Sequence, residues 1–127
     1  SEFIAKYPDY SKYGMGRWIC ERKEDGEIIG WCGLKYHPDI DQVDLGYRFS
    51  QRYWNMGYAT ESSVGSLCYG FETLNLEQVY ADALIGNPAS IRVMEKLGMS
   101  YWKTVFDDDG EWKYYLLKRE EWFARHG

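Results

Sequence analysis

Two stretches of the 127-residue chain carry residues that could bind an anionic ligand. The first, 44–61 (DLGYRFSQRYWNMGYATE), runs from an extended aromatic segment through the polar break at 50–52 to Gly57, just before residues that can open a helix. The N-terminus of a helix offers unpaired backbone amides and a partial positive charge, which favour a phosphate. Arg52 would add charge, and the Thr60 hydroxyl could donate a hydrogen bond. An ordinary strand-to-helix loop explains the same residues equally well.

The second stretch, 87–99 (NPASIRVMEKLGM), is typical of a capped helix. Asn87 is an expected N-cap with Pro88 at the first helical position, and Gly98 stands where a left-handed C-terminal cap belongs. In this structural interpretation Ser90 is simply a residue of the first helical turn. The second stretch alone therefore specifies no enzyme.

Around these two stretches, strand and helix patterns alternate in the order β β β α β α β β. The strands are expected at 17–22, 28–36, 43–49, 79–84, 99–106 and 111–117, and the helices at 58–74, 87–97 and 119–124. Hairpin turns are expected at Asp25-Gly26 and at 107–110. Residues 1–16 are interpreted as a helix remnant followed by a loop. The whole chain, 1–127, is expected to form a single domain.

The segment 43–84 predicts a parallel strand–helix–strand unit with a right-handed crossover. Ligands of open α/β sheets bind beyond the C-terminal ends of such strands, so 52–60 and 86–90 are expected to lie close together. Within the strand 43–49, a period of two places alternate residues on opposite faces of the sheet. One face is expected to carry Val43, Leu45, Tyr47 and Phe49, and the other Asp44, Gly46 and Arg48.

The composition argues against several classes of function. A formal net charge of -5 argues against non-specific binding to nucleic acid and slightly favours a cationic substrate. No apolar run approaches the roughly 18 residues of a membrane span. The three cysteines are scattered in apolar segments, which is typical of a reducing, cytoplasmic compartment, and no metal-ligand spacing is present.

Taken together, and following a GWCGL strand and a DLGY strand, the two stretches closely resemble the acetyl-CoA-dependent N-acetyltransferases of the GNAT superfamily. The branch named for ribosomal-protein Nα-acetyltransferases is the most similar, with its "GY", "W-G-x-G-YATE" and "N-x-x-S-x-R-V-x-E-K-x-G" pattern. The resemblance covers about 17–122. It implies an α/β (α+β) fold: a mixed, mainly antiparallel sheet with a central parallel strand–helix–strand unit and flanking helices.

The resemblance also implies a function. Acetyl would pass from acetyl-CoA, as co-substrate and without a metal, to a primary amine on a protein N-terminus or on a small molecule such as a polyamine or aminoglycoside. The strand around Tyr47 would pair with the pantetheine arm, and the amides of 52–60 would hold the pyrophosphate. The coenzyme residues implied in this way are Tyr47, Arg48, Phe49, Arg52, Asn55, Met56, Gly57, Tyr58, Ala59, Thr60, Asn87, Ser90, Arg92 and Lys96.

In the mechanism that the resemblance implies, the amine attacks the acetyl carbonyl directly while backbone amides polarise that carbonyl. Asp44 is the candidate base that accepts the proton of the amine, although a simple salt bridge to Arg48 would also explain it. Ser90 is the candidate proton donor to the leaving thiolate. Cys68 lies mid-helix on the expected apolar stripe, which disfavours a covalent acetyl-cysteine route.

Two departures from the family pattern favour an alternative, a non-catalytic or truncated CoA-binding or interaction module. Asn55 stands where the first glycine of the phosphate loop is expected. A full domain of the family begins with one more strand and one or two helices, so the chain is expected to be truncated there. Otherwise a second copy would cover the exposed sheet edge as a homodimer. The acidic turn 107–109 either faces a cationic acceptor or is an ordinary solvated turn.

Overall fold

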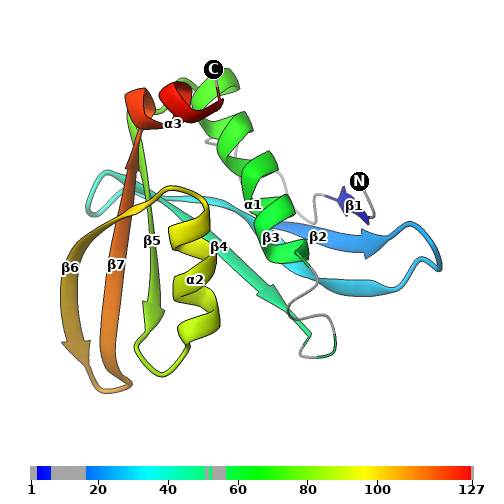
Figure 1. Ribbon diagram of the computed structural model, residues 1–127, viewed down its shortest axis with the longest axis horizontal. Helices are drawn as coiled ribbons and strands as arrows, with labels where there is room; N and C mark the ends of the chain where they lie inside the picture. Colours follow the sequence, from blue (N-terminus) through cyan, green and yellow to red (C-terminus); the bar gives the residue numbers. More distant parts are fainter. Residues whose placement is uncertain (1–2, 7–16, 51, 53–56, 127) are drawn as a thin grey trace.

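The computed structural model describes residues 3–6, 17–50, 52 and 57–126 (Figure 1). Its strands are β1 (Phe3–Lys6), β2 (Arg17–Arg22), β3 (Ile28–His37), β4 (Gln42–Phe49), β5 (Gln78–Leu84), β6 (Ser100–Asp107) and β7 (Gly110–Lys118). Its helices are α1 (Tyr58–Cys68), the π-helical continuation η2 (Tyr69–Thr73), α2 (Pro88–Lys96) and α3 (Arg119–His126). From β2 onward, the predicted elements are confirmed, with boundaries within about two residues, as expected for pattern-based prediction.

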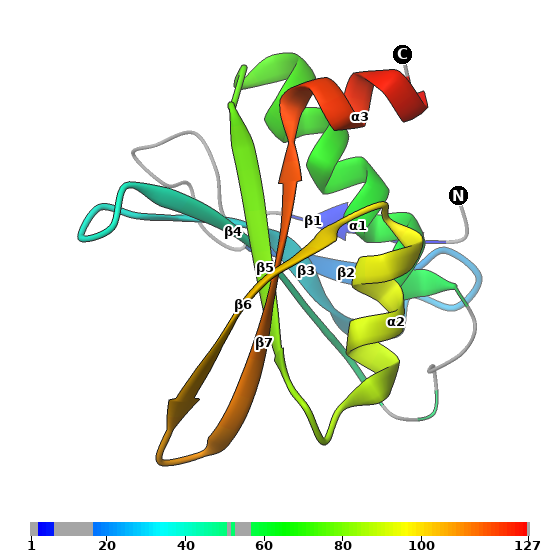
Figure 2. The ribbon, with the colours of Figure 1, turned by 60° about the vertical axis from the view of Figure 1, so that its left-hand side comes forward.

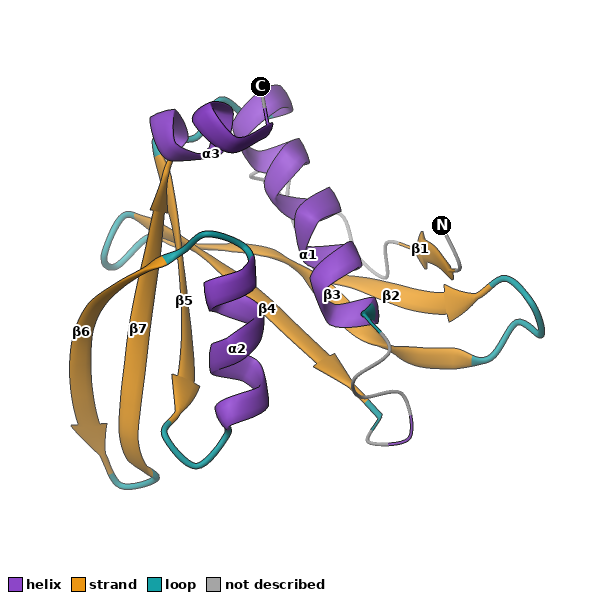
Figure 3. Ribbon diagram, in the orientation of Figure 1, coloured by secondary structure: helices purple, strands orange, loops and turns teal. Residues whose placement is uncertain are grey.

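The strands form one mixed sheet in the order β1-β2-β3-β4-β5-β7-β6 (Figure 3). β4 and β5 are parallel, with Asp44 opposite Tyr80, and the other neighbouring strands are antiparallel. The predicted mixed, mainly antiparallel α/β fold with a central parallel unit is therefore confirmed.

The sheet divides between β4 and β5. β4 pairs with β3 along its whole length, as far as Phe49 opposite Gly30, and β5 pairs with β7 as far as Leu84 opposite Trp112. Between β4 and β5, by contrast, the register records only the pair of Asp44 and Tyr80, near the beginning of both strands. Figure 1 shows the two strands separating toward their C-terminal ends, with α2 over the space between them. The C-terminal ends of β4 and β5 therefore lie apart, with a gap between them.

The helices α1 and α2 cover one face of the sheet (Figure 2). The predicted alternation along β4 is confirmed, since Val43, Leu45 and Phe49 are buried while Arg48 is exposed. The three buried residues belong to a hydrophobic core in which Leu67 of α1 and other helix residues are fully buried. Burial of alternate β4 residues under the helices leaves the intervening residues, Asp44 among them, on the opposite face of the strand.

The helix expected at 58–74 changes to π geometry in its last part. The Leu74 N–H donates to the Tyr69 carbonyl at 3.0 Å, five residues back, and the Arg119 side chain donates to the Phe71 carbonyl. A π turn shifts the carbonyl positions at the helix end, which lets a side chain from elsewhere in the chain reach one of them. Asn75 follows this helix with a left-handed φ of 62°, a backbone angle typical of the residue that ends a helix.

The N-terminal segment differs from the expectation. Phe3–Lys6 form β1, antiparallel to β2, so the helix-remnant interpretation of 1–16 is wrong for these four residues. The outer edge of β2 presents backbone donors and acceptors that an extended segment can satisfy. The edge that was expected to be vacant therefore carries β1, and residues 7–16 lie outside the described residues.

Candidate functional site

A cleft of about 770 Å³ lies between the C-terminal end of β4, the N-terminal end of α1 and the length of α2. Its volume is in the range of small-molecule and cofactor sites. The residues that line it are Tyr47, Arg48, Phe49, Ser50, Gly57, Tyr58, Ala59, Thr60, Asn87, Ala89, Ser90, Arg92, Val93 and Lys96. The expected proximity of the two chemistry-bearing stretches is therefore confirmed for 57–60 and 87–90.

All the predicted coenzyme residues that the structure describes line this cleft, except Arg52. The Arg52 guanidinium lies 3.3 Å from a Glu27 carboxylate oxygen, and 69% of its side chain is exposed. Asn55 and Met56 fall in 53–56, outside the described residues. Arg52 is thus held toward the β2–β3 turn rather than toward the cleft.

Sequence reasoning missed Ser50, Ala89 and Val93 as lining residues. Ala89 and Val93 are four positions apart, and helical residues at this spacing lie on one face. Arg92 and Lys96 have the same spacing and also line the cleft. Helical periodicity applied to the predicted cleft residues of α2 would therefore have identified Ala89 and Val93.

The first turn of α1 lines the cleft. Gly57 is the N-cap, with a φ of 83°, a backbone angle that glycine adopts without steric cost. The first hydrogen bond of the helix runs from the Glu61 N–H to the Gly57 carbonyl at 2.9 Å, so the amides of Ala59 and Thr60 have no acceptor within the helix. No described side chain caps this end. These amides and the helix dipole form a site suited to an anion.

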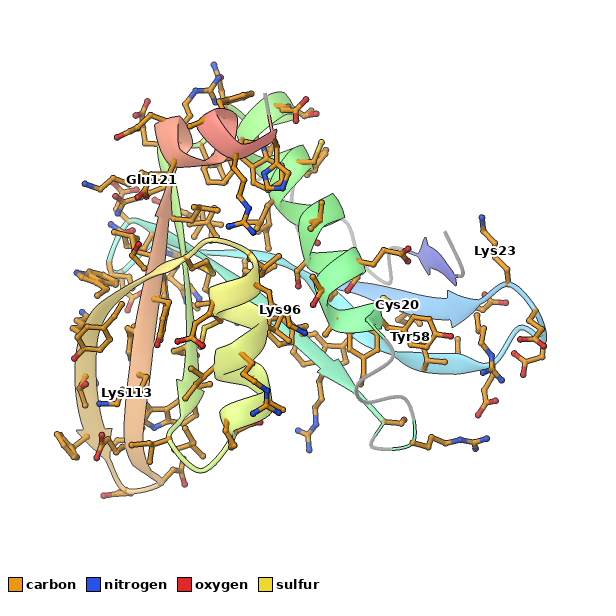
Figure 4. All side chains as sticks on the ribbon, viewed as in Figure 1. Cys20, Lys23, Tyr58, Lys96, Lys113 and Glu121 are labelled. Atoms are coloured by element: carbon orange, nitrogen blue, oxygen red, sulfur yellow. The ribbon has the colours of Figure 1, made fainter. Side chains whose placement is uncertain are left out.

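The charges around the cleft agree with such a ligand. Arg48, Arg92 and Lys96 line it, and no carboxylate of the described residues does. Figure 4 shows Lys96 on α2 and Tyr58 at the beginning of α1. In a chain of net charge -5, this concentration of cations is local, and it favours phosphate groups over a cationic ligand in the cleft.

Tyr47 and Ser90 connect β4 to α2 beside the gap in the sheet. The Ser90 hydroxyl donates to the Tyr47 oxygen at 3.0 Å, and the Tyr47 hydroxyl donates to the Ser90 carbonyl at 2.9 Å. The predicted cap of α2 is confirmed, since the Ser90 N–H donates to the Asn87 side chain at 3.2 Å. Only the backbone of Tyr47 was expected to matter, and its side chain proves to join β4 to α2.

The buried position of Tyr47 predicts the pH at which its phenol ionises. Burial raises its pKa from the ordinary 10.0 to about 12, against a smaller lowering by the hydrogen bond with Ser90. The folded state therefore favours the neutral phenol. Its stabilising contribution is complete below pH 10 and is lost as the pH rises through about 12. The measurement is the absorbance at 295 nm of the wild type minus that of Tyr47→Phe, which reports the Tyr47 phenolate. We expect this difference to appear near pH 12. A midpoint near 10 would contradict this.

Asp44 lies on the face of β4 opposite the cleft, beside the gap. Its carboxylate is 2.5 Å from His37 Nε2, and its side chain is 18% exposed. The salt-bridge alternative had Arg48 as the partner of Asp44, but the structure provides His37 from β3. A carboxylate bonded to an imidazole can accept a proton while its orientation is held. His37 was missed because it lies at the far end of a neighbouring strand.

Other candidate groups are occupied or absent in the described part of the chain. The Cys68 thiol donates to Glu72, and this hydrogen bond raises its pKa, which keeps it protonated and poorly nucleophilic. The Asp107 carboxylate accepts hydrogen bonds from the Trp112 indole and from two turn amides, which supports the ordinary-turn interpretation at that residue.

No group of His, Cys, Asp and Glu among the described residues could hold a metal ion. Among those residues, no helix is long and apolar enough to cross a membrane.

Comparisons with known proteins show the family of the chain. The sequence profile of the acetyltransferase (GNAT) domain matches residues 1–100. The chain is 42% identical over 95 residues to the uncharacterized protein YkkB of Bacillus subtilis, covering 73% of this chain and 55% of that protein. It is 31% identical over 126 residues to the FsC-acetyl coenzyme A-N(2)-transacetylase of Aspergillus fumigatus, covering 86% and 52%. The chain thus spans about half the length of these curated relatives.

Solved structures show the same fold. A GNAT-family acetyltransferase from Bacillus anthracis superposes with a TM-score of 0.74 at 24% identity, covering 82% of this chain and 66% of that one. The spermidine/spermine N-acetyltransferase SpeG from Vibrio cholerae superposes with a TM-score of 0.75 at 17% identity, covering 87% and 68%.

Proposed function

The chain belongs to the GNAT acetyltransferase family, and we propose that it transfers an acetyl group from acetyl-CoA to a primary amine by direct attack. The observation that carries the proposal is the cleft between β4, α1 and α2, which opens beside the gap between β4 and β5. A coenzyme that occupies this cleft can deliver a thioester to the gap, where an amine can reach it from the other face of the sheet.

The cleft residues match the chemical parts of the coenzyme. The amides of Ala59 and Thr60 suit the pyrophosphate, with Arg92 and Lys96 supplying positive charge along α2. Asn87 and the backbone of β4 around Tyr47 suit the amide groups of the pantetheine arm, because the edge of β4 that faces the gap lacks a recorded partner strand beyond Asp44.

The reaction needs two proton transfers. The amine must be neutral to attack the acetyl carbonyl, and Asp44, held by His37, accepts its proton. The departing sulfur must gain a proton, and the Ser90 hydroxyl, which the Tyr47 oxygen holds beside β4 by accepting its hydrogen bond, supplies it. Backbone amides of β4 polarise the carbonyl while charge develops on its oxygen.

The acceptor is proposed only as a class. SpeG is named for spermidine and spermine, and the Aspergillus fumigatus relative is named as an N(2)-transacetylase. The negative charge of the chain outside the cleft favours a cationic amine. The narrower resemblance to the ribosomal-protein branch, the cytoplasmic location and the homodimer stay predictions.

A CoA-binding module without catalysis is the second candidate. The anion site at the beginning of α1 requires no catalytic group, and Arg52, a predicted phosphate contact, pairs instead with Glu27. Calorimetry with acetyl-CoA and a thiol-release assay over a panel of amines separate the two functions. Binding together with thiol release supports the transferase, and binding without release from any amine supports the module. The absence of acetyl-CoA binding by folded protein would overturn both.

The positive charges of α2 that line the cleft, Arg92 and Lys96, are expected to contribute to acetyl-CoA binding. Replacing either Arg92 or Lys96 by Gln should weaken acetyl-CoA binding about fivefold, and the effect should shrink at high salt, because each removes one charge from the phosphate side of the cleft. Lys23→Gln is the matched control, since Lys23 is an exposed residue of the β2–β3 turn, away from the cleft (Figure 4). Equal affinities for all three variants would contradict the proposed position of the phosphates.

A further inference from the structure

A cluster of aromatic rings lies on the face of the sheet that α1 and α2 leave uncovered. The rings of Tyr80 on β5 and Tyr114 on β7 are stacked, with centroids 5.7 Å apart and planes at 15°. Trp102 on β6 meets both rings edge-on, at 6.0 and 6.1 Å. His37 on β3 approaches Tyr80 at 6.2 Å. We call Tyr80, Trp102 and Tyr114 the ring cluster.

The alternation of β5 fixes which face the ring cluster occupies. Val79 and Ala81 are buried in the core shared with the helices, so Tyr80 and Asp82 face the other way. Figure 2 shows the helices on one side of β5, β6 and β7 and no helix of the described chain on the other. Tyr80 is nevertheless only 5% exposed, while Trp102 is 38% exposed. Within the ring cluster Tyr80 is therefore buried, while Trp102 is accessible to a ligand.

An ammonium group already lies against these rings. The Lys103 Nζ is 4.2 Å from the centre of the Trp102 ring and 5.3 Å from that of Tyr114. Both distances are within the range in which the negative face of an aromatic ring attracts a cation. Lys103 is an exposed residue of β6, so its side chain can leave the rings for solvent.

Carboxylates give the same region a negative potential. Burial raises the pKa of Tyr80, and the negative charges of Asp44 and Asp82 raise it further. For Tyr114 burial and the neighbouring Asp82 act in the same direction. Rings and carboxylates that face the same space attract a cation more strongly than either does alone.

The ring cluster also lies next to the proposed site of chemistry. Tyr80 is the register partner of Asp44, at the point where β4 and β5 separate. The coenzyme cleft opens on the helix side of this gap and the ring cluster lies on the opposite side. An acceptor bound at the ring cluster is therefore positioned to approach the gap from the face opposite the coenzyme.

We propose that the ring cluster, with Asp44 and Asp82 beside it, binds an ammonium group of the acceptor, and that Lys103 occupies the rings in its absence. The inference rests on the proposed acetyl transfer and names its substrate class. The attacking nitrogen must be neutral, so it cannot also be the cation on the rings. The acceptor is therefore a primary alkylamine with a second positive charge, such as a diamine.

The test compares 1,4-diaminobutane with butylamine in a thiol-release assay, for the wild type and three variants. Trp102→Leu should raise the KM of the diamine about fivefold and Trp102→Phe about twofold, whereas the KM of butylamine should change less than about twofold. Lys103→Met should lower the KM of the diamine about threefold, because it removes the competing internal ammonium. A gain of this kind cannot come from misfolding. The affinity for acetyl-CoA should not change.

A KM for the diamine that neither Trp102→Leu nor Lys103→Met alters would overturn the proposal while leaving the acetyltransferase intact. If no amine releases thiol, binding is read directly from the Trp102 indole N–H signal by NMR, assigned by its loss in Trp102→Phe. Titration with 1,4-diaminobutane should shift this signal, and 1,4-butanediol, the uncharged analogue, should not. A shift without thiol release would keep the cation site and reject the transfer. No shift would reject the cation site.

Discussion

Replacing Asp44 by Asn is expected to lower kcat for amine acetylation by about 100-fold to 10,000-fold at neutral pH, the range typical of a lost general base. The substitution keeps the shape of the side chain and its position beside His37, but an amide cannot take the proton of the attacking amine. The affinity for acetyl-CoA should be preserved, because Asp44 faces away from the coenzyme cleft. Steady-state kinetics at saturating acetyl-CoA measure the effect.

The pH dependence separates loss of a base from loss of structure. In Asp44→Asn the solvent must supply the neutral amine, so the rate should climb with pH toward the amine pKa of about 10.4 and recover much of the lost activity. Asp108→Asn is the control: it removes the same charge from an exposed turn and should leave kcat unchanged. A kcat for Asp44→Asn within twofold of the wild type would remove Asp44 from the mechanism.

Gly30→Ala should produce the largest loss of stability, with the free energy of unfolding falling by about 3 kcal/mol. A Cβ at Gly30 would lie 2.2 Å from the Arg48 carbonyl oxygen and 2.8 Å from the Phe49 Cα, both on β4. β3 cannot shift easily to relieve the clash, because it pairs with β2 on its other side, where Cys20 lies opposite Gly30. Urea unfolding measures the change.

The same substitution reaches the site. Arg48 and Phe49 line the coenzyme cleft, so displacing the end of β4 should also weaken acetyl-CoA binding. Gly65→Ala is the matched control: an added Cβ in α1 meets nothing within 4 Å, and alanine should raise the free energy of unfolding by about 1 kcal/mol. Equal stability of the Gly30→Ala and wild-type proteins would show that β3 and β4 separate at no cost.

Short-range patterns predicted most of the elements. The N-cap at Asn87 and the left-handed Gly98, with a φ of 88°, set the limits of α2, and both depend on neighbours within a few residues. Two such local signals, the glycine before α1 and the cap of α2, were enough to locate the cleft. The strands that precede these two helices, β4 and β5, are parallel neighbours, so their C-terminal ends lie at the same edge of the sheet.

Contacts between distant segments were not predictable in this way. The hydrogen bonds between Tyr47 and Ser90, the pairing of Asp44 with His37, and the packing of Tyr80, Trp102 and Tyr114 each join residues from different strands or helices. β1 was missed for the same reason, since its strand conformation depends on hydrogen bonds to β2 rather than on its own sequence.

By itself the sequence indicated the family, the order of the strands and helices from β2 onward, and a candidate backbone site for an anion, because periodicity, capping and turn residues are local properties. Only the tertiary structure decided which side chains meet across the gap between β4 and β5. Strand register and the twist of the sheet set those meetings, and both depend on the packing of the whole core. The partner of Asp44 and the ring cluster on the uncovered face are the results of that packing.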